Sequence, residues 1–160
     1  MTQIYQTENF IVAAADLPHV SRADGGHLII YPKVKLRDRT QLSPKMAIEL
    51  MRLTMLAGEA MTIGLNNRGI DLGRINYQDN GNWSVFKPEG SYLHIHLYGR
   101  AKNAKVHKWG DSCYFPHRET GFYDKFEPLD KEDILEIQKQ IEIIKKQDKY
   151  QSSEWGLNKN

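Results

Sequence analysis

The nine residues at positions 92–100, Y-L-H-I-H-L-Y-G-R, constrain the fold more than any other stretch because two kinds of side chain alternate along them. A period of two is typical of a β-strand, in which successive side chains point to opposite faces. One face would be apolar and would pack into the core: Leu93, Ile95 and Leu97. The other face would carry polar rings: Tyr92, His94, His96 and Tyr98. Two histidines between two tyrosines favour a functional site over a plain solvated face, for which Thr, Lys or Glu would serve.

Three roles fit His94 and His96 on one strand face: metal binding, proton or phosphoryl transfer, and a solvated surface. A metal site needs a third ligand, and the candidates occur without diagnostic spacing: His27, His107 and His117. We therefore expect no metal and no cofactor. Basic residues exceed acidic ones between positions 87 and 108, which suits an anionic ligand beside the histidines, although a solvated edge has the same composition.

The length and composition of the chain limit the classes of protein to which it can belong. The 160 residues suffice for one domain with a single hydrophobic core, placed at 1–150, followed by a polar tail at 151–160. No apolar run approaches the roughly 20 residues of a membrane span, and the first residues lack a secretory signal pattern. The one cysteine, Cys113, allows no internal disulfide. We expect a cytoplasmic protein that binds no membrane, and the net charge of +2 is too small to indicate a nucleic acid polymer as partner.

Local patterns predict the remaining elements. Short strands are expected at 10–15, 27–31, 73–78 and 83–86, the last two joined by a hairpin turn at 79–82. A first helix should begin at Ser43-Pro44 and end near Gly64, and a second should begin near Asp130. The segment 101–128 shows no sustained period, and a loop of this length is usually functional or mobile.

The segment 92–100 resembles the signature of the histidine triad (HIT) family, in which three histidines alternate with apolar residues and an arginine follows shortly. We choose the register that puts Tyr92 at the first histidine position, His94 at the central one and His96 at the third. Upstream, residues 26–33 are similar to the family's Gly-His segment, which supplies a further active-site histidine, here His27. The resemblance implies an α+β fold with a five-stranded antiparallel sheet and two main helices, and a homodimer.

The resemblance also implies roles for these residues. The central histidine, His94, would attack the α-phosphate of a nucleotide to form a covalent nucleotidyl-imidazole, which water then hydrolyses. An imidazole suits this task because it is neutral and nucleophilic near pH 7. His96 would bind phosphate oxygens, and His27 would orient or charge-balance His94. Tyr92 departs from the family's pattern: it can still donate one hydrogen bond, but it cannot carry imidazolium charge at neutral pH.

Five further residues resemble positions that contact substrate in the family or close its motif: Asn80, Asn82, Gly90, Ser91 and Arg100. Turn geometry explains Asn80 equally well, and an exposed strand end explains Arg100. The resemblance implies a hydrolase that cleaves a phosphoanhydride or phosphoramidate bond in a nucleotide or dinucleotide, such as a dinucleoside polyphosphate or a nucleoside phosphoramidate. A nucleotide-binding module that has lost catalysis and a nucleotidyltransferase using the same histidine are the alternatives.

Overall fold

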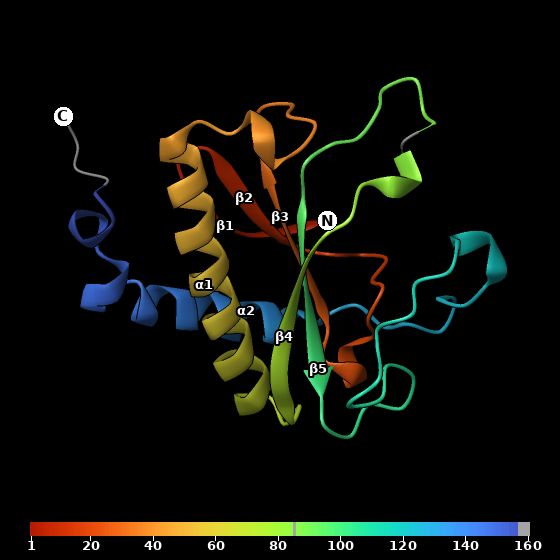
Figure 1. Cartoon of the computed structure of the whole chain (residues 1–160). Helices are drawn as coiled ribbons and strands as arrows, with labels where there is room; N and C mark the ends of the chain where they lie inside the picture. The colour runs from red at the N-terminus through yellow and green to blue at the C-terminus, as the bar shows by residue number, and fades with distance from the viewer. Residues whose placement is uncertain (85, 157–160) are drawn as a thin grey trace.

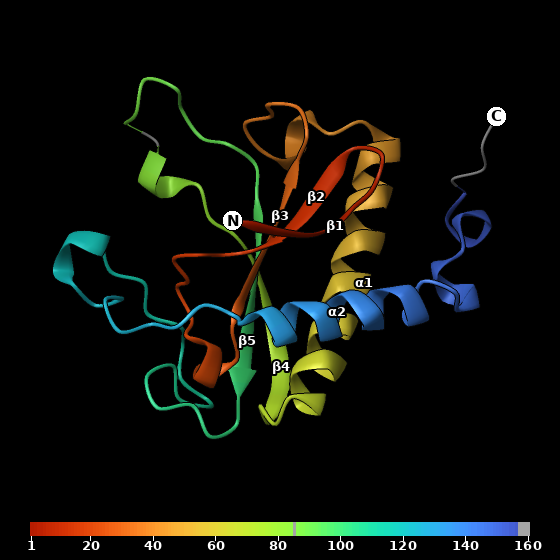
Figure 2. The same cartoon turned by 180° about the vertical axis from the view of Figure 1, so that it is seen from behind.

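Five antiparallel strands form a single sheet in the computed structural model, which describes residues 1–84 and 86–156. The strands are β1 (Thr2–Gln6), β2 (Phe10–Ala14), β3 (His27–Pro32), β4 (Leu72–Asp79) and β5 (Ile95–Ala101), in the spatial order β1-β2-β3-β5-β4. Helices α1 (Pro44–Asn67) and α2 (Lys131–Ile144) cover one face, and long loops lie beyond the other, as Figures 1 and 2 show from two sides. The predicted α+β class with five strands and two main helices is confirmed.

Both helices begin where their capping residues predict. The Ser43 hydroxyl accepts a hydrogen bond from the Met46 amide at 3.2 Å, and Pro44 occupies the first turn, where an amide would have had no partner. At the start of α2, the Asp130 carboxylate accepts from the Asp133 amide, and the Asp133 carboxylate accepts from the Asp130 amide in return. The predicted starts of both helices are confirmed.

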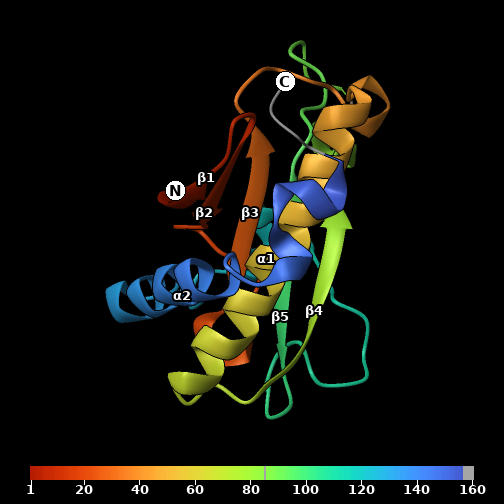
Figure 3. The same cartoon turned by 90° about the vertical axis from the view of Figure 1, so that its left-hand side faces the viewer.

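The apolar face of the 92–100 segment packs into the core as predicted. Leu93, Ile95 and Leu97 expose at most 5% of their surface and join the helices in one hydrophobic cluster. Figure 3 views the molecule from the side on which α1 and α2 cover the sheet. The regular strand begins at Ile95, three residues later than expected. Its opposite face is also covered, since His96 is 4% exposed and Tyr98 is fully buried. The rings of His96 and Tyr98 are therefore covered by other parts of the chain and do not lie on a solvated surface.

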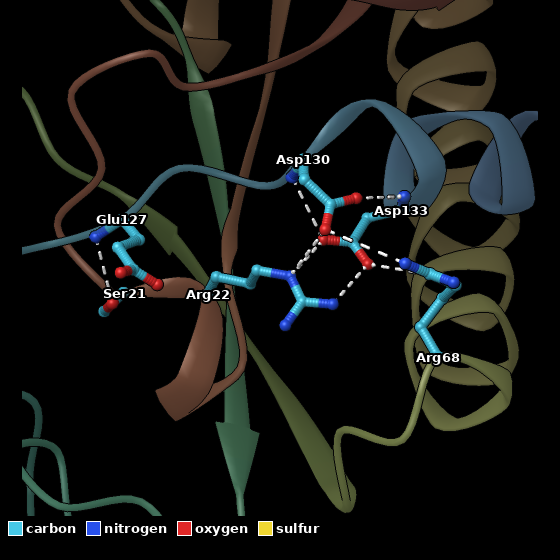
Figure 4. A network of polar contacts seen from close by, with 6 residues as sticks. All are labelled: Ser21, Arg22, Arg68, Glu127, Asp130 and Asp133. Carbon is cyan, nitrogen blue, oxygen red and sulfur yellow. Dashed lines mark hydrogen bonds and ion pairs between the residues drawn. The ribbon is translucent and has the colours of Figure 1, made fainter.

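Helix α2 is anchored by the buried carboxylate of Asp133 (Figure 4). Arg22 donates to it twice, at 2.5 and 2.8 Å, and Arg68 at the end of α1 donates at 3.3 Å. A buried carboxylate is stable when such charged donors satisfy its oxygens. Because Arg22 lies five residues before β3, this network ties α2 to the segment that leads into His27.

The predicted strand at 83–86 is wrong for residues 83, 84 and 86, and residue 85 lies outside the described residues. Residues 82–84 form a 3₁₀ helix, and the turn at 79–82 closes no hairpin, because β4 pairs directly with β5, with Asp79 opposite Ile95. The residues from 80 to 94 form a long connection instead. The fifth strand is β1 at the N-terminus, which the sequence patterns did not predict.

The remaining connections agree with the sequence patterns. The segment between β5 and α2 is irregular apart from a short 3₁₀ helix, Arg118–Thr120. In the predicted tail, Ser152–Trp155 forms a further 3₁₀ helix, and residues 157–160 lie outside the described residues. Within the described part of the chain, neither helix is long and apolar enough to cross a membrane.

Candidate functional site

The floor of the candidate site is made by neighbouring strands β3 and β5. Their register places His27 opposite Tyr98 and therefore two residues along from His96 on the same face. His27 Nε2 lies 2.8 Å from His96 Nδ1, and both rings are buried. Gly25 and Gly99 permit this close approach, since a Cβ at Gly99 would overlap the Gly25 carbonyl. The structure thus joins His27 and His96, which lie 69 residues apart in the sequence.

The hydrogen bonds fix the tautomers of these two rings. The backbone N–H of His19 donates to His27 Nδ1 at 3.1 Å, so the proton of a neutral His27 ring is on Nε2. That proton is donated to His96 Nδ1, and the proton of a neutral His96 ring is consequently on Nε2. His96 therefore offers one N–H donor to the pocket that it lines.

The opposite tautomer is imposed on His94. Its Nδ1 lies 2.6 Å from the backbone carbonyl oxygen of Tyr92, which can only accept, so Nδ1 carries the proton. The lone pair of a neutral His94 is then on Nε2. His94 lines the pocket beside His96, with the ring centroids 4.6 Å apart and the planes nearly perpendicular. His94 can therefore donate an electron pair, and the neighbouring His96 can donate a hydrogen bond.

Tyr92 contributes to this arrangement through its backbone. Its carbonyl orients His94, whereas its hydroxyl donates to the Pro32 carbonyl at 2.7 Å, at the end of β3. Any residue at position 92 supplies that carbonyl, so the departure from histidine leaves the tautomer of His94 unchanged. The Tyr92 side chain is outside the pocket lining.

His19 is a site residue that sequence reasoning missed. Its ring stacks on His27 at 5.3 Å, its Nδ1 lies 3.1 Å from the Tyr98 hydroxyl, and it lines the pocket. Burial, with a smaller contribution from the Arg118 charge, lowers the pKa of His19 to about 4. Burial likewise lowers the pKa of His96 to about 3 and that of His27 well below its ordinary value. All three rings are therefore neutral at pH 7.

Three of these histidines are close enough to bind a metal ion together. Ligating nitrogens of His19, His27 and His96 lie within 4.8 Å of one another. However, His27 Nδ1 already accepts an amide proton, so Nε2 would have to lose its own proton before it could coordinate. The other two ligands considered from the sequence, His107 and His117, are not in this group. The hydrogen bonds favour a relay of neutral imidazoles over a metal centre.

A pocket of about 340 Å³ opens above His94 and His96. This volume is within the range of small-molecule sites. Its walls come from two loops, and the residues lining it are His19, Asn80, Gly81, Trp83, Ser84, Lys87, His94, His96, Phe115 and Arg118. The loops meet where Trp83 stacks on His117, with centroids 5.0 Å apart. The pocket thus combines reactive imidazoles, aromatic surface and two cations.

Solved structures share the fold of this chain, although no protein-family model and no curated protein matches the sequence. A zinc-bound histidine triad family protein from Mycobacterium smegmatis matches with a TM-score of 0.57 and 17% identity over 89% of this chain and 84% of that one. A hypothetical histidine triad nucleotide-binding protein from Sulfolobus tokodaii matches at 0.56 and 16%, over 89% and 85%. The chain has the histidine triad fold. A Hit-like protein involved in cell-cycle regulation from Bartonella henselae matches at 0.54 and 13%, over 89% and 84%.

The other predicted site residues take different places on this histidine triad fold. Asn80 lines the pocket and lies 3.4 Å from the Tyr98 hydroxyl. Gly90 and Ser91 lie in the connection to β5 and outside the pocket lining, and the side chain of Asn82 lies outside the described residues. Arg100 is buried, not an exposed strand end, and it donates to backbone carbonyls of the loop after β5. Arg100 therefore holds a loop and does not face the pocket.

Proposed function

We propose that this chain is a nucleotide hydrolase that cleaves a phosphoanhydride or phosphoramidate bond at the α-phosphate through a covalent nucleotidyl-His94. One observation carries the proposal: the Tyr92 carbonyl holds the proton of His94 on Nδ1 and leaves the Nε2 lone pair available in the pocket. A positioned nucleophile of this kind divides one difficult displacement into two easier steps.

In the first step, His94 Nε2 forms a bond to the α-phosphorus, and the bond to the leaving group breaks with its electron pair. The His96 N–H donates to a non-bridging phosphate oxygen, where negative charge develops. The His94 ring becomes positively charged, and its Nδ1–H stays on the Tyr92 carbonyl. In the second step, the oxygen of a water molecule forms a bond to phosphorus, the bond from phosphorus to His94 Nε2 breaks with its electron pair left on Nε2, and water loses a proton to solvent. The nucleoside monophosphate leaves, and neutral His94 is restored.

The pocket walls suit the nucleoside part of such a substrate. Trp83 and Phe115 supply aromatic surface on which a base can stack, and Asn80 supplies an amide that can bind polar substituents. The substitution at position 92, which motivates the alternative of a binding module without catalysis, affects a side chain outside the pocket lining. This geometry favours the enzyme over the module.

The proposal is tested by turnover and adduct formation with a dinucleoside polyphosphate and a nucleoside phosphoramidate. We expect hydrolysis of at least one of them, and a nucleotidyl adduct on intact protein quenched in denaturant at alkaline pH, where phosphohistidine is stable. Removing the nucleophile in His94→Ala should lower kcat/KM by about 10⁴-fold or more while calorimetry still detects nucleotide binding. Full activity of His94→Ala would refute the proposal. Binding without turnover would favour the module, and transfer to an added acceptor would favour a nucleotidyltransferase.

We further propose a homodimer through α1 and β4. Strand β4 is an edge of the sheet, and beside it α1 exposes apolar side chains along one stripe: Ile48, Met51 and Met55. Tyr77 of β4 is 49% exposed, and with Met51 and Met55 it lines a groove of about 510 Å³. An exposed edge with an adjacent apolar stripe is suited to pairing with a second copy. Light scattering should show a dimer, and Met55→Lys should dissociate it. Ile143→Lys, which makes the same kind of change on the exposed surface of α2, should leave the dimer intact.

A further inference from the structure

The charged residues of the pocket are all basic. Lys87 comes from the connection between β4 and β5, and Arg118 comes from the 3₁₀ helix Arg118–Thr120. Among the described residues that line the pocket there is no Asp or Glu. The buried rings of His19 and His96 add no charge at pH 7, because burial lowers the pKa of His19 to about 4 and of His96 to about 3. The positive charge of the site therefore comes from its walls.

Arg118 is held in place by contacts that leave most of its donors available. One Nη2–H donates to the Leu17 carbonyl at 2.6 Å, and the guanidinium carbon lies 5.1 Å from the centre of the Tyr123 ring. The Tyr123 hydroxyl donates in turn to the Pro116 carbonyl at 2.8 Å. A guanidinium has five N–H donors, so the remaining ones can bind an anion.

The two possible leaving groups require different chemical groups in the pocket walls. A phosphoanhydride releases a phosphate or nucleotide, which departs with additional negative charge and requires no proton at neutral pH. A phosphoramidate releases an amine, which must gain a proton as its bond to phosphorus breaks. The imidazoles beside His94 are neutral at pH 7, so His19 and His96 are poor sources of that proton. Two fixed cations stabilise the negative charge that develops on the first leaving group, whereas an uncharged amine gains no such stabilisation.

We propose that Lys87 and Arg118 form a subsite for the anionic leaving group, so that the substrates of this site are phosphoanhydrides such as dinucleoside polyphosphates. The inference rests on the proposed function and deepens it. The bond from His94 Nε2 to the α-phosphorus forms, the bond from that phosphorus to the bridging oxygen breaks, and the electron pair stays on the departing phosphate, where the two cations stabilise it.

The test compares two substrates that share an adenosyl α-phosphate: diadenosine tetraphosphate and an adenosine phosphoramidate with an uncharged amine leaving group. Arg118→Gln and Lys87→Gln should each lower kcat/KM for the anhydride by about 10- to 100-fold, and for the phosphoramidate by less than about threefold. Arg118→Lys, which keeps the charge, should recover part of the loss. Lys125→Gln, on exposed surface outside the pocket lining, should leave both values unchanged.

The outcomes separate this inference from the function on which it rests. Equal losses on both substrates, or no loss on the anhydride, would overturn the anion subsite. Better turnover of the phosphoramidate by the unaltered protein would also overturn it, while leaving nucleotidyl transfer to His94 intact. If neither substrate is turned over and no adduct forms, the proposed function itself fails. Because Arg118 also donates a hydrogen bond to the Leu17 carbonyl, thermal unfolding of Arg118→Gln is measured to test whether the variant keeps its structure.

Discussion

The floor and the walls of the pocket are built in different ways. The floor is part of the sheet: strand register and backbone groups place His27, His94 and His96 and set their tautomers. The walls are loop segments whose described residues, 80–84, 86–87 and 115–118, belong to no strand. In the proposed mechanism the floor supplies the reacting imidazoles, and the walls supply the groups that bind the substrate and its leaving group.

The loop after β5 is held by side chains that replace regular secondary structure. The buried carboxylate of Asp24 accepts three backbone amides, from Lys105, Val106 and His107, at 2.9 to 3.0 Å. Arg100 donates to carbonyls of the same loop. Farther along, the rings of Phe122, Tyr123 and Phe126 pack against one another, and Phe115 packs against Tyr98 of β5. The Asp24 carboxylate and the Arg100 guanidinium thus hold the backbone of this loop in place, whereas hydrogen bonds between strands hold the backbone of the floor.

The largest effect in this comparison is expected from substitutions of His96 that keep a polar group at the position of one ring nitrogen and remove the other. Asn places an acceptor near the position of Nδ1, and Gln places a donor near that of Nε2. His96→Asn should keep the bond from His27 but lose the phosphate donor, lowering kcat/KM by about 10²-fold or more. His96→Gln should lose less activity and more stability. Steady-state kinetics and urea unfolding of both variants measure this; equal activity losses would show that the donor on Nε2 has no special role.

Breaking the wall anchor should have the next largest effect, and mainly on stability. Asp24→Asn replaces an acceptor oxygen with an N–H₂ group that faces backbone donors, so the free energy of unfolding should fall by about 2–3 kcal/mol. Urea unfolding measures that loss. Asp71→Asn, at a surface carboxylate paired with Lys102, is the matched control and should cost well under about 1 kcal/mol. Similar losses in the two variants would contradict the special role of Asp24.

The floor should also make stability depend on pH. His96 has a pKa of about 3 in the folded protein and an ordinary pKa of about 6.5 when unfolded. Below about pH 6.5 the unfolded chain binds a proton that the folded chain does not, so stability falls with acidification. From His96 alone we expect a loss of about 1.4 kcal/mol between about pH 7.5 and pH 5.5. Urea unfolding should show a smaller loss in His96→Asn; an unchanged pH dependence would contradict this.

The difference between the floor and the walls also explains which features could be predicted from the sequence. Strand periodicity is local, so the inner face of β5 and its polar outer face followed from the 92–100 segment alone. The caps at Ser43 and Asp130 are equally local. The family resemblance added His27, whose partner lies 69 residues away, because the Gly-His segment resembles a known motif. Each of these features depends on a few neighbouring residues.

The walls depend on contacts that no local pattern reports. Trp83 and its neighbours look like a strand, yet the Trp83 ring packs against His19 and His117, and β4 takes β5 as its partner. His19 follows Pro18 in a segment without periodicity, and only the return of that segment over β3 brings it to the site. Strand β1 was missed because its five residues, TQIYQ, contain few apolar side chains. A basic residue such as Arg118 has no sequence signal that separates it from solvated arginines.

The smallest effect is expected at the position where the chain departs from the histidine triad pattern. The Tyr92 carbonyl belongs to the floor, whereas the Tyr92 hydroxyl bonds the Pro32 carbonyl outside the pocket lining. Tyr92→Phe should therefore lower the free energy of unfolding by about 1 kcal/mol, the contribution of one hydrogen bond, and leave kcat/KM within about threefold. The phenyl ring of this variant preserves packing, so unfolding in urea reports the hydroxyl alone. A missing phosphate donor is expected to lower kcat/KM by about 10²-fold. A loss of that size in Tyr92→Phe would show that the Tyr92 hydroxyl, and not only the Tyr92 carbonyl, takes part in the reaction.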